Sequence, residues 1–117
     1  MAEKQCNLVK NRGGVQYSTS EVMTGDTWID GKPVYRITLT GTAPSVAGAM
    51  NIQIPNLDTL VSWQGFITST PRIALQYHDE STNFSGYGTS TDKIQIWCAG
   101  TAVLSKSYAI TVWYTKT

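Results

Sequence analysis

Hydrophobic and polar residues alternate along most of the chain, beginning near Val15. In residues 32–42, for example, Tyr35, Ile37 and Leu39 are separated by single arginine or threonine residues. A period of two places successive side chains on opposite faces of a β-strand, whereas a helix would need a period of 3.6. The pattern therefore predicts strands that each have one buried and one solvent-exposed face.

Turn signals separate these strands. Asp30-Gly31 lies between a short strand and the strand at residues 32–42, and this dipeptide is among the strongest hairpin signals. Residues 42–49, which contain Pro44 and Gly48, predict a loop, and residues 79–92, rich in glycine, serine and threonine, predict a long irregular one. We predict further strands over residues 27–29, 50–54, 60–68, 72–78, 93–99 and 107–115. This order is typical of an all-β fold, either an antiparallel sandwich or a small barrel.

Aromatic residues are placed by the same alternation. In the last strand we expect Tyr108, Ile110, Val112 and Tyr114 to face one side, and Ala109, Thr111 and Trp113 to face the other. The four tryptophans all lie within strand patterns, and their expected role is packing in the core or at a subunit interface: Trp28, Trp63, Trp97 and Trp113. Four such side chains exceed what one thin core hides comfortably, which favours an interface between subunits.

Composition narrows the class of protein. The 117 residues suffice for one domain, and 41% are hydrophobic, so the chain is expected to fold. Only 15% are charged, which is low for a globular domain. The chain has 16 threonines and 10 serines as uncharged polar residues instead, and this composition favours β-structure. The net charge of +1 supplies no basic field, so we expect no nucleic acid partner. No apolar run is long enough to predict membrane insertion.

The first 14 residues differ from the rest. They contain several charged side chains, end in Gly13-Gly14 and lack the apolar core of a signal peptide. We predict that residues 1–14 are a leader or stem, with a frayed terminus as the alternative, and that residues 15–117 form the domain. Cys6 and Cys98 do not make a disulfide framework, and Cys98 is expected to be a small buried hydrophobic residue.

Catalytic groups are scarce. The chain has one histidine, His78, and no serine-elbow or phosphate-cradling motif, so we predict no enzyme, no metal site and no cofactor. A small polysaccharide hydrolase stays open as an alternative, because folding could bring two carboxylates together across a groove. The acids available for such a pair are Glu21, Asp26, Asp30, Asp58, Asp79, Glu80 and Asp92.

One cluster has the composition of a binding patch. Exposed tyrosines beside neutral hydrogen-bonding groups can form a shallow contact surface for carbohydrate or protein. The predicted patch consists of Gln76, Tyr77, His78, Asp79, Asn83 and Tyr87. The alternative is an ordinary hydrophilic loop.

Two short stretches resemble a known family. Residues 17–36 roughly follow the pattern Y-S-T-x-E-x-x-x-G-x-W-x-D-G-K-P-x-Y, with two residues instead of one between the glycine and the tryptophan, and the chain closes with Y-T-K-T. Both are similar to signatures that open and close a C-terminal β-rich module of bacteriophage tail-fibre and minor structural proteins. The matching positions are Tyr17, Glu21, Trp28, Asp30, Gly31, Lys32, Tyr35 and Tyr114.

The resemblance implies a virion appendage, assembled in the host bacterial cytoplasm, whose trimeric, jelly-roll-like β-sandwich head contacts a glycan or protein on the host surface. It also implies contact with other virion proteins through the N-terminal segment. The chain would then be either a domain excised from a longer fibre or a small stand-alone protein. The first alternative to this function is a capsid or fibre decoration protein without receptor contact, and the polysaccharide hydrolase is the second.

We interpret the motif residues as scaffold. Asp30-Gly31 supplies the turn, and Trp28 and Tyr35 suit the buried face of the sheet. Glu21 is expected to pair with Lys32 or Arg36 across neighbouring strands.

Overall fold

The protein is described from a computed structural model, which describes residues 17–117. The predicted leader, residues 1–14, lies outside this part of the chain, as does Cys6. The described residues form eight strands and contain no helix: β1 (Val22–Thr27), β2 (Pro33–Thr42), β3 (Gly48–Gln53), β4 (Leu57–Ile67), β5 (Tyr77–His78), β6 (Asn83–Ser90), β7 (Lys93–Ala99) and β8 (Ser107–Lys116). In this part of the chain there is accordingly no helix that could cross a membrane.

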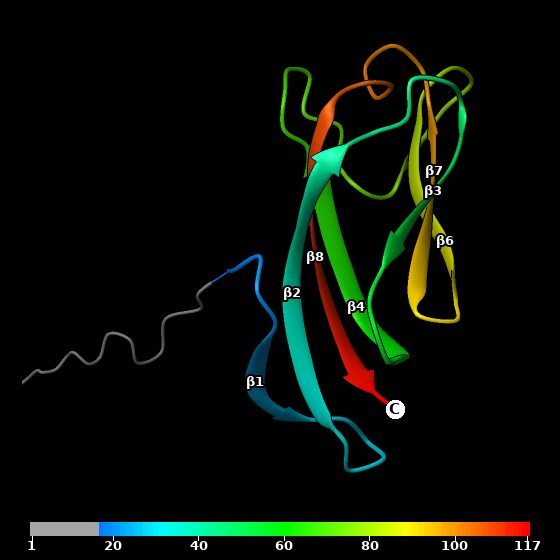
Figure 1. The fold of residues 1–117 in the computed structure, drawn as a ribbon. Helices are drawn as coiled ribbons and strands as arrows, with labels where there is room; N and C mark the ends of the chain where they lie inside the picture. Colours follow the sequence, from blue (N-terminus) through cyan, green and yellow to red (C-terminus); the bar gives the residue numbers. More distant parts are fainter. Residues whose placement is uncertain (1–16) are drawn as a thin grey trace, which may run out of the picture.

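The strands form two antiparallel sheets that pack face to face (Figure 1). One sheet has the order β1-β2-β8-β4 and the other has the order β3-β7-β6-β5, so the all-β sandwich prediction is confirmed. β2 pairs with β8 in one sheet, and β3 pairs with β7 in the other. The segment β2–β3 therefore runs antiparallel to the segment β7–β8 through both sheets, as in a jelly roll. The winding is only partial, because β5, β6 and β7 are sequential neighbours in one sheet.

The core lies between the two sheets and follows the predicted alternation. Along β8, Tyr108, Ile110, Val112 and Tyr114 are all buried, as the sequence predicts. From the facing sheet, the fully buried side chains are those of Phe84, Ile94, Ile96 and Cys98. The prediction of a buried Cys98 is therefore confirmed, and burial raises the pKa of its thiol to about 11.

The hairpin at Asp30-Gly31 is also confirmed. β1 pairs with β2, Asp30 Oδ1 accepts a hydrogen bond from Lys32 N at 3.0 Å, and Gly31 has φ of +90°. That conformation favours glycine, because other residues meet a steric penalty there. The loop predicted over residues 42–49 also exists, although β2 extends to Thr42 and β3 starts at Gly48.

The long loop predicted over residues 79–92 is wrong. Most of it is β6, which pairs with β7 along its whole length. One of the glycines that suggested a loop has a packing role instead: a Cβ on Gly86 would lie 2.1 Å from Trp63 Cζ2. The indole of Trp63 therefore crosses from β4 to lie on β6, and only glycine leaves it space.

The strand predicted over residues 72–78 is mostly wrong. Only Tyr77–His78 form β5, and Ala74 makes an isolated bridge to Phe66. The expected pairing of Glu21 with Lys32 or Arg36 is also wrong. Lys116 Nζ lies 2.8 Å from Glu21 Oε1, and the Tyr114 hydroxyl donates to the same carboxylate.

Lys32 has a different partner, Asp58, with Nζ 2.7 Å from Oδ2. Residues 18–21 continue the line of β1 along β2, as the hydrogen bond from Thr38 N to Ser18 O shows. This course brings Glu21 to the end of β8 rather than to the cations of the hairpin.

Candidate ligand-binding site

An exposed tryptophan stands on the outer face of the second sheet. Ile94, Ile96 and Cys98 of β7 point into the core, so the residues between them point outward. Trp97 is one of these, and 42% of its surface is exposed. Trp97 therefore does not pack in the core of this chain, and the other expected role, packing at a subunit interface, stays a prediction.

Strand register assembles polar groups beside this indole. Ser85 of β6 lies directly opposite Trp97, and His78 of β5 lies opposite Asn83. Tyr87 lies on the same face as Ser85, because it follows two residues later on β6, next to a β-bulge between Gly86 and Gly88. The five side chains line a shallow depression of about 490 Å³: His78, Asn83, Ser85, Tyr87 and Trp97. We call this surface the Trp97 face.

Hydrogen bonds fix the polar groups in place. Asn83 Nδ2 and His78 Nδ1 are 2.7 Å apart, and Ser85 Oγ donates to the carbonyl oxygen of Tyr77 at 3.0 Å. When Asn83 donates to Nδ1, the neutral imidazole carries its proton on Nε2 and can donate from there. The depression is therefore a preformed arrangement and needs little ordering when a ligand binds.

The Trp97 face is uncharged. None of its five residues carries a formal charge when His78 is neutral, and the aromatic pair is well exposed, with Tyr87 at 55%. On the neighbouring part of the same sheet, Gln95 Nε2 donates to Asn51 Oδ1 at 3.2 Å. Aromatic rings surrounded by neutral amides and hydroxyls are suited to a neutral, hydroxyl-rich ligand.

The predicted patch is only partly assembled here. His78, Asn83 and Tyr87 lie together at the depression, whereas Gln76 and Asp79 act as local scaffold. The Gln76 amide accepts from Gly86 N at 2.6 Å and donates to Gly86 O at 2.9 Å, in the manner of a paired strand.

Asp79 closes the turn between β5 and β6. Its carboxylate accepts from the Tyr77 hydroxyl at 2.7 Å and from the backbone N–H groups of Ser81 at 2.9 Å and Thr82 at 2.7 Å. The hydrogen bond from Tyr77, followed by those two backbone bonds, lowers the pKa of Asp79. Tyr77 and Asp79 are therefore occupied with each other.

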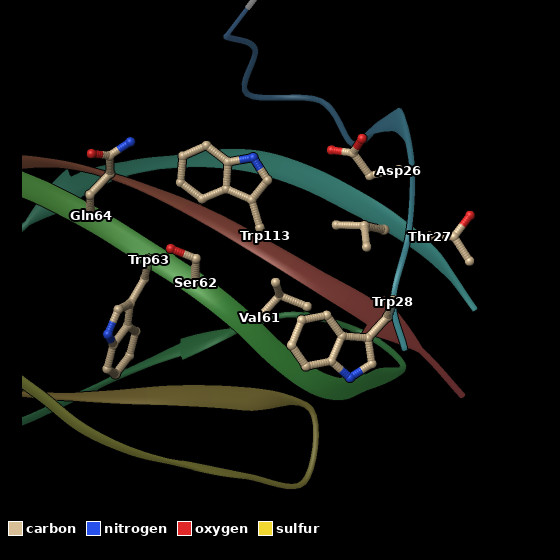
Figure 2. Close-up of a pocket in the computed structure, with 9 residues that line it drawn as sticks. Asp26, Thr27, Trp28, Val61, Ser62, Trp63, Gln64 and Trp113 are labelled. Atoms are coloured by element: carbon tan, nitrogen blue, oxygen red, sulfur yellow. The ribbon is translucent and has the colours of Figure 1, made fainter. Parts of the chain in front are cut away.

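A second hollow lies on the outer face of the first sheet. Figure 2 shows Trp113 and Asp26 projecting from one side of this sheet, while Trp63 projects from the opposite side toward the other sheet. Trp28, Trp113, Asp26, Ser62, Gln64 and Val61 help to line a groove of about 450 Å³. We call it the Trp113 groove. Trp28, expected on the buried face, lines this groove instead and is only half-buried.

A wider depression of about 740 Å³ adjoins the groove at Gln64. Tyr17 and Phe66 contribute aromatic rings to it, and both are substantially exposed. Tyr17 also covers Arg36, whose guanidinium carbon lies 5.4 Å from the ring centroid. Arg36 is therefore buried although it points away from the core, so the outer face of β2 is not uniformly exposed to solvent.

Comparison with known proteins identifies no relative: no protein family, no curated protein and no solved structure matches this chain. The resemblance to phage appendage modules therefore depends on the two sequence signatures. The two candidate sites are identified from the positions of their lining residues in the structure.

Proposed function

We propose that the protein is a non-enzymatic, carbohydrate-binding module that attaches a phage virion appendage to glycans on the host surface. The observation that carries the proposal is the Trp97 face. It combines two exposed aromatic rings with fixed neutral hydrogen-bonding groups on a rigid sheet.

Glycans suit this surface for two reasons. Pyranose rings present C–H groups that pack on aromatic faces, and their hydroxyl groups both donate and accept hydrogen bonds. Ser85, Asn83 and His78 offer both kinds of polar group close to Trp97. A shallow, open surface also accommodates one part of a long polymer, which a closed pocket would not.

The distribution of carboxylates supports binding over hydrolysis. A glycosidase needs two carboxyl groups flanking the scissile bond. Glu21 and Asp58 are each bonded to a lysine, and Asp79 is bonded within its own turn. Among the described residues, no carboxylate lines the depression at Trp97, and Asp26 alone lines the Trp113 groove.

Weak single sites become effective through multivalency. The trimer implied by the resemblance would hold three copies of the Trp97 face on one axis, so that avidity compensates for modest affinity at each copy. Light scattering on the full chain tests this part of the proposal, with an expected mass of three times 12.8 kDa. A folded monomer at micromolar concentration would contradict the trimer and favour a decoration subunit.

The binding proposal is tested with the full chain displayed on tetravalent streptavidin and applied to a printed array of bacterial surface glycans. We expect retention on neutral glycans, and we expect the same glycans to keep their mass after prolonged incubation with the protein. Absence of binding to every glycan would overturn the proposal, and a shortened glycan would favour the hydrolase.

A further inference from the structure

The geometry points to a second binding site: we infer that the Trp113 groove takes the positively charged ammonium group of an organic ligand. The site is on the opposite sheet from the Trp97 face and shares no residue with it. The inference is therefore independent of the function proposed above.

The walls of the groove are two indole rings held by regular structure. Trp113 lies on β8, the strand between β2 and β4, on the side away from the core. Trp28 follows β1 and is fixed by the hairpin, since its N–H donates to Lys32 O and its carbonyl accepts from Gly31 N, both at 2.9 Å. The backbone positions from which both rings project are therefore fixed by the sheet and its hairpin.

Asp26 supplies a negative charge that no described residue neutralises. Its backbone N–H is bonded to Thr24 Oγ1 at 3.1 Å, but its carboxylate makes no hydrogen bond or ion pair with any residue that the structure describes. Glu21 and Asp58, by contrast, each have a lysine within 2.8 Å. Asp26 is also the one charged residue among those described at the groove.

The combination is selective for a cation. The faces of indole rings carry negative charge density and attract ammonium groups, most strongly where water is displaced. Val34 and Val61 also line the groove and add apolar groups to it. Ser62 and Gln64 add oxygens that can accept from N–H groups.

Two sources of the ammonium group are available on cell surfaces: a choline head group and a de-acetylated amino sugar. The test uses NMR of the full chain with ¹⁵N-labelled tryptophan, which reports each indole N–H separately. The probes are choline and hexameric glucosamine. Their neutral counterparts are 3,3-dimethylbutanol and hexameric N-acetylglucosamine.

We expect at least one charged probe to shift the indole signals of Trp28 and Trp113 at concentrations where its neutral counterpart does not. The probe that succeeds identifies the source. Asp26→Asn should weaken binding of that probe at least fivefold, because it removes the charge and keeps the shape. Asp30→Asn is the matched control, since it removes the same charge from the same hairpin while its amide oxygen can still accept from Lys32 N.

Three results would overturn the inference. The first is the absence of shifts with both charged probes. The second is equal binding of a charged probe and its neutral counterpart, which would make the groove merely apolar. The third is equal loss in Asp26→Asn and Asp30→Asn, which would indicate a general field instead of a site. These results are judged from the indole signals of Trp28 and Trp113 alone, because a shift of the Trp97 indole with a hexasaccharide would report binding at the Trp97 face.

Discussion

The Trp97 face and the Trp113 groove begin from the same local arrangement and differ in their surroundings. In each, a tryptophan on an inner strand of its sheet is out of phase with the buried residues and so points outward. Around Trp97 the neighbours are uncharged and the surface is open. Around Trp113, the β1–β2 hairpin adds a second indole and the carboxylate of Asp26, which has no partner among residues 17–117. Neighbouring strands and turns, more than the tryptophan itself, therefore distinguish the two faces.

The largest expected effect comes from the core that both surfaces share. Ile96 is fully buried directly behind the Trp97 face, and Ile96→Ala should lower the free energy of unfolding by about 2–5 kcal/mol. Urea unfolding followed by tryptophan fluorescence measures this loss. A loss below about 1 kcal/mol would mean that the sheets are not packed as described.

A substitution with a smaller loss of stability should affect the Trp97 face and leave the Trp113 groove unchanged. In Gly86→Ala the new methyl group would overlap the ring of Trp63, so we expect a loss of about 1–3 kcal/mol. Because Gly86 is next to Tyr87, signals from the Trp97 face should shift in NMR spectra, while the indole signal of Trp113 should stay in place. Gly88→Ala is the control, since a Cβ there meets no atom closer than 3.9 Å. Equal effects of the two substitutions would contradict the packing of Trp63 on Gly86.

Alkaline pH should weaken the common core. Burial raises the pKa of the Cys98 thiol to about 11, from an ordinary value of 9.0, and burial together with the hydrogen bond to Glu21 raises the pKa of Tyr114. The folded protein therefore holds these protons more tightly than the unfolded chain. Stability should be complete below pH 9 and should fall as the pH rises toward 11. Cys98→Ala should show a shallower fall in urea unfolding, and an unchanged slope would contradict a buried thiol.

Acidic pH should have a smaller effect, at the N-terminal edge of the first sheet. Burial acts to raise the pKa of Glu21, but hydrogen bonds from Lys116 and Tyr114 outweigh it and lower that pKa. The stabilisation from Glu21 is therefore present above the ordinary pKa of a glutamate and is lost as the pH falls through the lowered value. Glu21→Gln should remove this pH dependence and less than about 1 kcal/mol of stability at neutral pH. Identical acid unfolding of the two proteins would show that the contact contributes nothing.

The smallest effect distinguishes the two aromatic residues of the Trp97 face. Tyr87→Phe removes one hydroxyl and keeps the aromatic ring, so it should weaken glycan binding only a few-fold. The array described above measures it. A loss as large as that of Trp97→Ala would make the Tyr87 hydroxyl the main contact.

Much of the fold was predictable because alternation and turn chemistry are local properties. The burial of Tyr108, Ile110, Val112 and Tyr114 follows from the period of two, and the hairpin follows from Asp30-Gly31. β6 was missed because Gly86 looks like a loop residue until Trp63, a neighbour only in space, is known. The partner of Glu21 was missed because Glu21, just before β1, meets Lys116 at the end of β8 only in the folded chain.

The candidate sites were predictable only in part, although a usable signal exists. Trp97 lies between Ile96 and Cys98, out of phase with the buried positions, and Trp113 is likewise out of phase between Val112 and Tyr114. The position of an aromatic residue on the exposed phase of a strand is therefore a better indicator of a ligand surface than the presence of the aromatic residue alone. Which polar groups join it depends on strand order and register, and these are not local properties.

The central claim, that the Trp97 face holds the glycan, is tested most directly by one pair of variants on the glycan array. Trp97→Ala removes an aromatic side chain that is 42% exposed, and Phe66→Ala removes one that is 43% exposed on the opposite sheet. We predict that Trp97→Ala lowers glycan retention at least tenfold and that Phe66→Ala leaves it unchanged, with both proteins folded. Equal retention by the two variants would contradict the account.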